Sequence, residues 1–338
     1  MRSIGALSGI VAGVALAAGT PAQGAEPIVW KFAFAGPSTS TNLTGGLQPW
    51  ANDVMKASEG TLEIKFFVGS VLSPIPQVYD RLVNNVFEVG YSTQASTRGI
   101  FPGSGVVDLP FLANDIRKTA VAFWHMYERG PLAAEYAKIH PVALYNYPGS
   151  GLQTKKPIHN LEDLKGVKIG TQGVVNSKIM QALGGTPITL TTTQNYESLQ
   201  RGMVDGVQMG WTGFVQFKLQ EVTSYHLGVS FGTPAGFTAV SKEAYGKLPA
   251  KAKAAVDKYS GEPFSARMGR ALHATADYQY NYVKGLPGHT MYDLDAKELA
   301  RWQERTKPIV DEWIASTPNG AKVLAAWKDE LKKAGDSM

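Results

Sequence analysis

Short runs of alternating apolar and polar residues recur along the chain, and segments with helical spacing separate them. The first alternating run is IVWKFAFAG (28–36), and the second is TLEIKFFVG (61–69). Between them, LQPWANDVMKASEG (47–60) has apolar residues at helical spacing and ends on a glycine. A further helix over 74–88 and a buried strand over 89–94 follow. Strands that alternate with helices predict parallel pairing and an α/β fold.

The same pattern starts again beyond residue 140. It predicts strands over 141–148, 167–171, 187–191 and 204–211, and helices that begin in 160–166, 174–184 and 193–203. The chain then returns through 236–249, and from about Lys251 to the end it is mostly helical, with 262–285 as one long helix. Two α/β units joined by several crossings are typical of a bilobal protein that closes on a hinge.

The first 25 residues have a different character. Arg2 precedes an uncharged, small and apolar run from Ile4 to Ala18, and small residues follow. This is typical of an export signal that is cleaved after Gly24 or Ala25. A transmembrane anchor is the alternative, but the apolar run is short for a span and rich in glycine and alanine. We expect 1–25 to be a signal peptide and the mature chain to be soluble, periplasmic and monomeric.

Composition excludes several functional classes. The chain has 338 residues, 44% of them hydrophobic and 18% charged, and no cysteine, so it has no disulfide, thiolate metal site or cysteine nucleophile. Its net charge of +5 comes from basic residues interspersed with acidic ones, which does not indicate a nucleic-acid partner. The six histidines lack metal-ligand spacing, and phosphate and dinucleotide motifs are missing. We therefore expect neither a cofactor nor a metal.

Candidate catalytic motifs have simpler explanations. In PGSG (148–151), Pro148 replaces the first glycine of a nucleophile elbow. Asp205, in the segment VDG, is suited to fixing a turn through side-chain to backbone hydrogen bonds. A bilobal exported enzyme and a sensor subunit that presents a bound solute to a receptor stay open as alternatives to a transport protein.

A succession of short motifs carries a family resemblance. They are VVDLPFL (106–112), KKPI (155–158), LEDLKGVKI (161–169), ALGGTPI (182–188), Tyr196, Leu199 and Gly202 with VDG (204–206), and VSKEAYGKLP (240–249). In this order and spacing the chain resembles the DctP-type solute-binding proteins of TRAP (tripartite ATP-independent periplasmic) transporters. The resemblance implies that the protein delivers a small solute, most often an organic acid, to a membrane permease and carries out no chemistry.

The resemblance also implies a bilobal, periplasmic-binding-protein-like fold with a ligand cleft between two α/β domains. Lobe 1 would comprise 26–147 plus 235–262, and lobe 2 would comprise 148–234. Residues 263–338 would form a long helix that braces both lobes and C-terminal helices that pack on both.

One position departs from the family pattern. The residue after the KI of this motif is typically an arginine that pairs with the ligand carboxylate, and here it is Gly170. A second basic residue, common in the strand before KKPI, is also missing from YNYPGSGLQT (145–154). We expect the anion clamp to be absent and the glycine to leave volume for a larger ligand.

Aromatic, amide and hydroxyl side chains near the expected cleft are the candidates to replace that clamp. Trp211 offers a stacking face, with a core or hinge position as the alternative. The full candidate set is Phe34, Gln94, Tyr145, Tyr147, Gly170, Thr171, Gln172, Gln208, Met209, Trp211 and Thr212. Three ligand classes stay open: an aromatic or bulky solute stacked on Trp211 and the tyrosines, a small cationic amine, and an organic acid held by backbone and amide donors.

Overall fold

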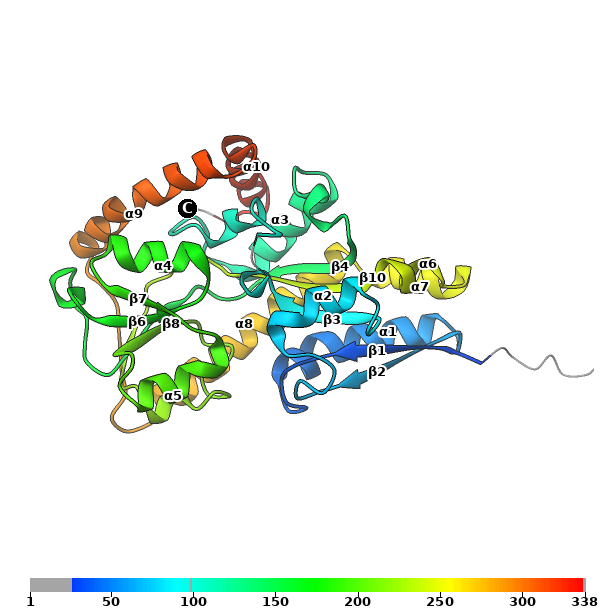
Figure 1. Cartoon of the computed structure of the whole chain (residues 1–338), viewed down its shortest axis with the longest axis horizontal. Coiled ribbons are helices and arrows are strands. Elements are labelled where there is room, and N and C mark those ends of the chain that lie inside the picture. Colours follow the sequence, from blue (N-terminus) through cyan, green and yellow to red (C-terminus); the bar gives the residue numbers. More distant parts are fainter. Residues whose placement is uncertain (1–25, 98, 337–338) are drawn as a thin grey trace, which may run out of the picture.

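The computed structural model describes residues 26–97 and 99–336, and it forms two lobes that are each built on one β-sheet (Figure 1). The first sheet has the order β2 (Leu62–Phe67), β1 (Ile28–Ala33), β3 (Val89–Thr93), β10 (Ala235–Ser241), β4 (Ile139–Asn146). The second has the order β11 (Thr290–Tyr292), β9 (Tyr225–Leu227), β5 (Gly151–Thr154), β8 (Gly206–Met209), β6 (Lys168–Thr171), β7 (Thr186–Thr189). This confirms the bilobal α/β fold class. The expected signal peptide lies outside the described residues.

Both sheets are mixed, whereas the strand–helix alternation predicted parallel pairing. β1 pairs in parallel with β2 and β3, and β6 pairs in parallel with β7 and β8. β10 is antiparallel to both β3 and β4, and β5 is antiparallel to both β8 and β9. The prediction was wrong for these strands because it treated each lobe as a continuous segment. β10 instead enters the first sheet on the return from the second lobe and runs between two strands of opposite direction.

Seven helices within the described residues flank the two sheets. They are α1 (Gln48–Ala57), α2 (Val78–Val83), α3 (Ile116–Glu128), α6 (Lys242–Gly246) and α7 (Ala250–Tyr259) on the first lobe, and α4 (Gly173–Ala182) and α5 (Asn195–Gln200) on the second. Two of the predicted helices are much shorter than expected. The helix of 74–88 ends at Val83 because Asn85 takes a left-handed conformation with φ of 56°. The segment 160–166 forms only a 3₁₀ turn, Glu162–Leu164, before Gly166 with φ of 77°.

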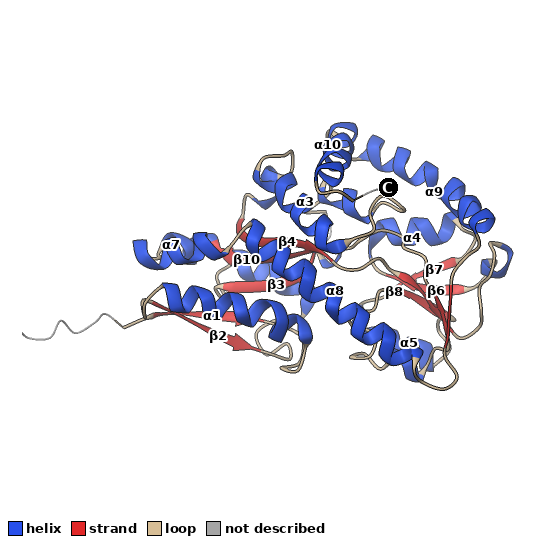
Figure 2. Cartoon of the chain, turned by 180° about the vertical axis from the view of Figure 1, so that it is seen from behind, coloured by secondary structure: helices blue, strands red, loops and turns tan. Residues whose placement is uncertain are grey.

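The single long helix expected over 262–285 is α8 (Glu262–Lys284), and it contacts both lobes (Figure 2). Near its start, Phe264 stacks on Trp50 of α1 with ring centroids 4.8 Å apart. Near its end, Gln279 accepts a hydrogen bond from the backbone N–H of Val215 at 2.8 Å and donates to the carbonyl of Thr212 at 3.1 Å. These contacts attach the one rigid helix to both lobes.

Two further helices, α9 (Ala296–Ser316) and α10 (Gly320–Lys333), end the chain. α9 also joins the lobes, because its Trp302 stacks on Phe231 in the second-lobe core while Trp313 lies in the first-lobe core. The expectation that 263–338 is helical misses β11, which pairs in parallel with β9 at the edge of the second sheet. β11 has only three residues, so its alternating run is too short to be recognised from the sequence.

The first sheet is buried on both faces. Trp30 and Phe32 of β1 pack toward α1, α7 and α8. Phe237 of β10 and Leu144 of β4 belong to the opposite core, with side chains of α3 and α10. The hydrophobic strands therefore have a layer of helices on each side, which fixes the position of their carboxyl ends.

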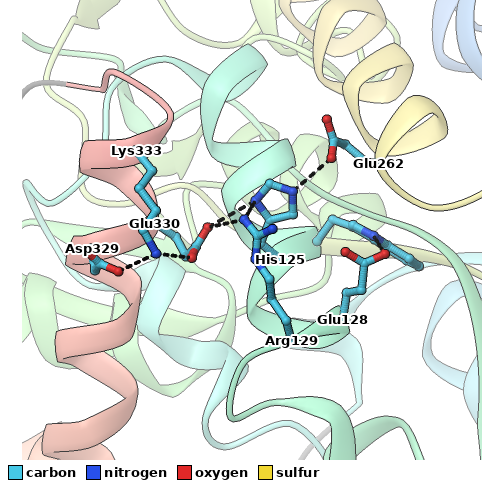
Figure 3. Close-up of polar contacts among 8 residues, drawn as sticks. His125, Glu128, Arg129, Glu262, Asp329, Glu330 and Lys333 are labelled. Atoms are coloured by element: carbon cyan, nitrogen blue, oxygen red, sulfur yellow. Dashed lines mark hydrogen bonds and ion pairs between the residues drawn. The ribbon is translucent and has the colours of Figure 1, made fainter.

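A network of charged side chains fixes α10 to α3 and α8 (Figure 3). His125 of α3 lies 3.0 Å from Glu330 of α10 through Nδ1 and 2.9 Å from Glu262 of α8 through Nε2. Arg129 and Lys333 contact the same Glu330 carboxylate at 3.2 and 2.9 Å. The C-terminal helix is thus held on the first lobe by polar contacts as well as by its apolar face.

Candidate ligand cleft

A cleft of about 800 Å³ lies between the two lobes. It is lined by the segments that follow the carboxyl ends of β1, β3, β6, β7 and β8, together with the crossings after β4 and before β10. This is the edge at which open α/β sheets usually bind ligands. Within residues 26–97 and 99–336, every side chain that lines the cleft is uncharged.

Three aromatic rings form what we call the aromatic wall on the first-lobe side: Phe34, Tyr91 and Tyr147. The ring centroids of Phe34 and Tyr91 are 5.3 Å apart, and Tyr147 meets Tyr91 edge-on at 6.5 Å. Tyr145 stacks on Tyr91 from within the core at 5.8 Å. The rings therefore support one another, and they present a preorganised apolar surface to the cleft.

The Tyr91 hydroxyl is the centre of a small hydrogen-bond network. It accepts from the Tyr147 hydroxyl at 2.7 Å and from Nδ2 of Asn42 at 3.2 Å. Burial raises the pKa of Tyr91 to about 12, although these two hydrogen bonds act in the opposite direction. The phenol is therefore protonated at neutral pH.

On the second-lobe side, a chain of amides connects three elements. Gln208 of β8 donates through Nε2 to Oδ1 of Asn176 at 2.8 Å, and Asn176 of α4 donates to the carbonyl of Gln172 at 2.9 Å. Gln172 in turn donates to the hydroxyl of Thr192 at 2.8 Å. Leu190, Met209 and Phe217 add apolar surface beside these amides.

Two cleft residues keep a buried amide oxygen without a hydrogen-bond partner in the described part of the chain. These are Oδ1 of Asn42 on the first lobe and Oε1 of Gln208 on the second. A buried acceptor without a partner costs about 1–3 kcal/mol. Both oxygens are shielded from solvent, so these two cleft residues each carry an unsatisfied acceptor.

The two lobes approach one another closely at the rim of the cleft. A Cβ at Gly173, where α4 begins with φ of 77°, would lie 3.5 Å from the Cβ of Ala95 beyond β3. A Cβ at Gly36 would lie 3.4 Å from Nε2 of Gln216 on the opposite lobe. Even a side chain as small as alanine at either position would be in van der Waals contact with the opposite lobe.

Six of the residues predicted from sequence line the cleft: Phe34, Tyr147, Gln172, Gln208, Met209 and Thr212. Three others are turned into the core. Gln94 donates to the hydroxyl of Tyr136 at 2.5 Å, the Tyr145 hydroxyl donates to the carbonyl of Phe237 at 2.8 Å, and the hydroxyls of Thr171 and Ser177 lie 2.8 Å apart. Their polar groups therefore make hydrogen bonds within the protein core.

Trp211 also lies outside the residues that line the cleft. Its ring packs 4.8 Å from Phe214, 5.3 Å from His226 and 5.4 Å from Tyr280 of α8. It is therefore part of the contact between α8 and the second lobe, which is the core or hinge alternative considered for it.

Gly170 does not leave open volume, contrary to expectation. A Cβ at this position would lie 2.8 Å from Cδ1 of Leu190 and 3.0 Å from Cγ1 of Val207. Leu190 lines the cleft, so the space beside the glycine is filled by an apolar side chain. Gly170 therefore affects the cleft indirectly, through Leu190, which packs against it.

Sequence reasoning missed Tyr91, Asn42, Asn176, Leu190 and Phe217. A signal existed for Tyr91, because period-two alternation in β3 puts it on the same face as Thr93, which also lines the cleft. No local pattern distinguishes Asn42 or Asn176 from other surface amides. Their position depends on how the two lobes meet.

Two α/β lobes, a cleft at their strand ends and helices attached to both are the architecture of bilobal solute-binding proteins. The family model of the bacterial extracellular solute-binding proteins, family 7 (DctP), matches residues 34–317, so the chain belongs to that family. It is the solute-binding component of a TRAP-type transporter, a class that works with a membrane permease. No helix within the described residues is long and apolar enough to cross a membrane.

Relatives with names and solved structures agree with this family. The chain is 25% identical to the C4-dicarboxylate-binding periplasmic protein DctP of Rhodobacter capsulatus over 97% of both chains. Its structure is similar, with a TM-score of 0.87 and 22% identity, to a marine metagenome TRAP solute-binding protein specific for aromatic acid ligands, in complex with 3-hydroxybenzoate; the match covers 91% of this chain and 99% of that one. The structure is also similar, with a TM-score of 0.85 and 23% identity, to a TRAP solute-binding protein from Rhodoferax ferrireducens in complex with copurified benzoate. That match covers 91% of this chain and 98% of the other.

Proposed function

We propose that this protein captures a small solute with an aromatic ring and delivers it to the permease of its transporter. The observation that carries the proposal is the aromatic wall, Phe34, Tyr91 and Tyr147, which faces Leu190, Met209 and Phe217 across the cleft. A flat apolar ring fits between two such surfaces, and burying it provides most of the affinity.

Among the described residues the cleft lining is uncharged, which supports a ligand held without an ion pair. If Gly170 stands where relatives carry the arginine, as the motif resemblance implies, an acidic ligand would bind to hydroxyl, amide and backbone donors. The solved structures of the two similar proteins contain 3-hydroxybenzoate and benzoate. At 22–23% identity this likeness shows the fold, so the support for a ring comes from this chain's own side chains.

Binding without chemistry is part of the proposal. The alternative, a bilobal exported enzyme, would require carboxylates that face each other across the cleft. Within the described residues, no aspartate, glutamate or histidine lines it, which supports capture over catalysis. A ring solute recovered unchanged after long incubation, as judged by mass spectrometry, is the expected result, and a modified solute would contradict it.

The remaining parts of the proposal concern the mature chain. Residues 1–25 would be removed on export, and a monomer of 26–338 would close its lobes around the solute in the periplasm. The lobes would be 26–147 plus 235–262 and 148–234, hinged at the crossings near Pro148 and Pro234, which are among the residues that line the cleft. A cleaved N-terminus in exported protein and a ligand-dependent decrease in radius of gyration by small-angle scattering would test these points.

The central test is a thermal-shift panel on purified 26–338 with benzoate, 3-hydroxybenzoate, benzylamine, glucose and succinate. A ligand at a hundredfold excess over its Kd adds about 2.7 kcal/mol, which raises Tm by several degrees. We expect at least one ring compound to stabilise the protein and glucose and succinate to have no effect. Stabilisation by succinate alone would overturn the aromatic assignment.

A further inference from the structure

The hydrogen-bond network at the aromatic wall leaves one proton without a partner. The Tyr91 oxygen has two lone pairs and one proton, and it accepts hydrogen bonds from Tyr147 and Asn42. Both acceptor sites are therefore occupied. Among the described residues there is no hydrogen bond in which Tyr91 donates, so its proton is available to another molecule.

The position of this hydroxyl favours contact with a bound solute. Tyr91 is half-buried on β3, lines the cleft, and has its ring held between Phe34 at 5.3 Å and Tyr145 at 5.8 Å. Two ring neighbours and two incoming hydrogen bonds fix both the ring and the hydroxyl oxygen. The donor is therefore preorganised, and binding a ligand requires little further ordering of this side chain.

The neighbouring groups strengthen the donor. A hydroxyl that accepts a hydrogen bond becomes a better donor, because chains of hydrogen bonds polarise one another in a low dielectric. A phenol is protonated at neutral pH even at its ordinary pKa of 10, and burial raises the pKa of Tyr91 further. Tyr147 donates toward Tyr91, so the proton of the Tyr91 hydroxyl is the one left without a partner among the described residues.

We propose that the Tyr91 hydroxyl selects the solute by donating a hydrogen bond to an acceptor oxygen, carboxylate or carbonyl, on the aromatic compound whose ring packs on the wall. This rests on the proposed function, capture of a ring solute in the same cleft. Tyr147 is a positioning residue that acts through Tyr91. Sequence reasoning had not singled out Tyr91, and it had assigned Tyr147 only as a contact.

The proposal predicts a difference between ligands that depends on their acceptors. Benzoate has a carboxylate acceptor, benzamide a carbonyl acceptor, and benzylamine carries the same ring with donors only. Removing the Tyr91 hydroxyl should therefore lower the affinity for benzoate and benzamide and leave the affinity for benzylamine unchanged. A loss of ring packing would weaken all three together, so the pattern separates recognition from structure.

The experiment measures Kd by calorimetry for these three probes with wild type, Tyr91→Phe, Tyr147→Phe and Tyr196→Phe. We expect Tyr91→Phe to weaken binding of benzoate, a charged acceptor, by about 10- to 100-fold and of benzamide, a neutral acceptor, by about 2- to 10-fold. Tyr147→Phe should weaken them by less than about tenfold, because it removes only the polarising bond. Tyr196→Phe is the matched control, since its hydroxyl contacts Glu221 at 3.0 Å and it is not part of the cleft lining.

The outcomes separate the two proposals. Suppose that wild type binds benzoate or benzamide. If Tyr91→Phe binds the same compound with equal affinity, or loses affinity for all three probes to the same extent, the Tyr91 inference is overturned and ring capture stands. If wild type binds benzylamine alone, the solute presents donors, and the Tyr91 inference is again overturned. If wild type binds none of the ring compounds, the proposed function itself fails. Unfolding midpoints without ligand show whether each variant is folded.

Discussion

Single residues decide what each strand end presents to the cleft, and Gly170 is the clearest case. Its missing side chain allows Leu190 and Val207 to pack at distances that a Cβ would disturb. The glycine therefore allows an apolar residue, Leu190, to lie beside it at the cleft.

Gly170→Ala should lower the free energy of unfolding by about 1–3 kcal/mol, because the added methyl overpacks the space against Leu190 and Val207. Urea unfolding of Gly170→Ala, Leu190→Ala and the double variant measures the coupling between the two sites. We expect the double variant to be more stable than the sum of the single losses predicts. Additive losses would mean that Leu190 does not fill the space beside the glycine.

Trp211→Ala should lower the free energy of unfolding by roughly 2–4 kcal/mol, somewhat less than for a fully buried tryptophan because the ring is only half-buried. Its contacts with Phe214, His226 and Tyr280 are lost, whereas the cleft lining is unchanged. Benzoate affinity, measured on the same sample, should stay within error of wild type. Phe34→Leu in the aromatic wall is the comparison, and it should weaken benzoate.

At the scale of elements, α8 and α9 attach the two lobes to each other, and α10 is fixed on the first lobe. α8 contacts both lobes along its length, α9 places one tryptophan in each core, and α10 is fixed to α3 and α8 by the network around Glu330 (Figure 3). Burial alone would raise the pKa of the Glu330 carboxyl. Hydrogen bonds with Lys333, Arg129 and His125 outweigh burial, and the pKa is lowered.

Glu330→Gln should lower the free energy of unfolding at pH 7 by about 1–3 kcal/mol, because it leaves the cations of the network without their carboxylate. The folded pKa lies below the ordinary value of 4.5, so this stability is present above pH 4.5 and is lost as the pH falls through the lowered pKa. Urea unfolding at pH 7, 5.5 and 3.5 should show the difference shrinking toward acid.

The matched control for that variant is Glu304→Gln, which removes the carboxylate of an exposed pair with Lys307. Exposed ion pairs contribute less than about 1 kcal/mol, so this variant should be close to wild type at every pH. Equal losses of unfolding free energy for the two variants would show that the network around Glu330 stabilises the protein no more than an exposed ion pair does.

For the whole molecule, the second crossing between the lobes rests on a buried carboxyl. Burial raises the pKa of Asp108 to about 7, although a hydrogen bond from the backbone of Ala235 acts against it, and its Oδ1 has no partner in the described part of the chain. The backbone N–H of Thr233 donates to the carbonyl of Val107 at 2.9 Å. The turn that carries Asp108 therefore supports the chain as it returns to the first lobe.

Because the folded pKa of Asp108 is raised, the folded protein holds this proton more tightly than the unfolded chain does. Its contribution to stability is therefore lost as the pH rises from about 4 through about 7. Asp108→Asn carries no charge at any pH, so it should gain stability relative to wild type over that range. Unfolding free energies at pH 4.5, 6 and 8 measure this gain. A constant difference between the two proteins would contradict the assignment.

The sequence by itself determined many of the helices and strands, the long helix α8, the bilobal α/β class and the family. Each of these depends on local periodicity or on the order of short motifs, such as LEDLKGVKI and ALGGTPI, and both are properties of contiguous segments. Six of the eleven candidate cleft residues followed as well, because strand ends can be located from the pattern.

Only the tertiary structure decided which side chains face the cleft. Trp211 and Tyr145 have the residue type of a ligand contact and lie in packed contacts, whereas Tyr91 lines the cleft with a proton to donate. Leu190 fills the space beside Gly170, and β10 runs antiparallel to its neighbours because it returns from the other lobe. These features depend on contacts between segments far apart in the chain, and no local pattern carries that information.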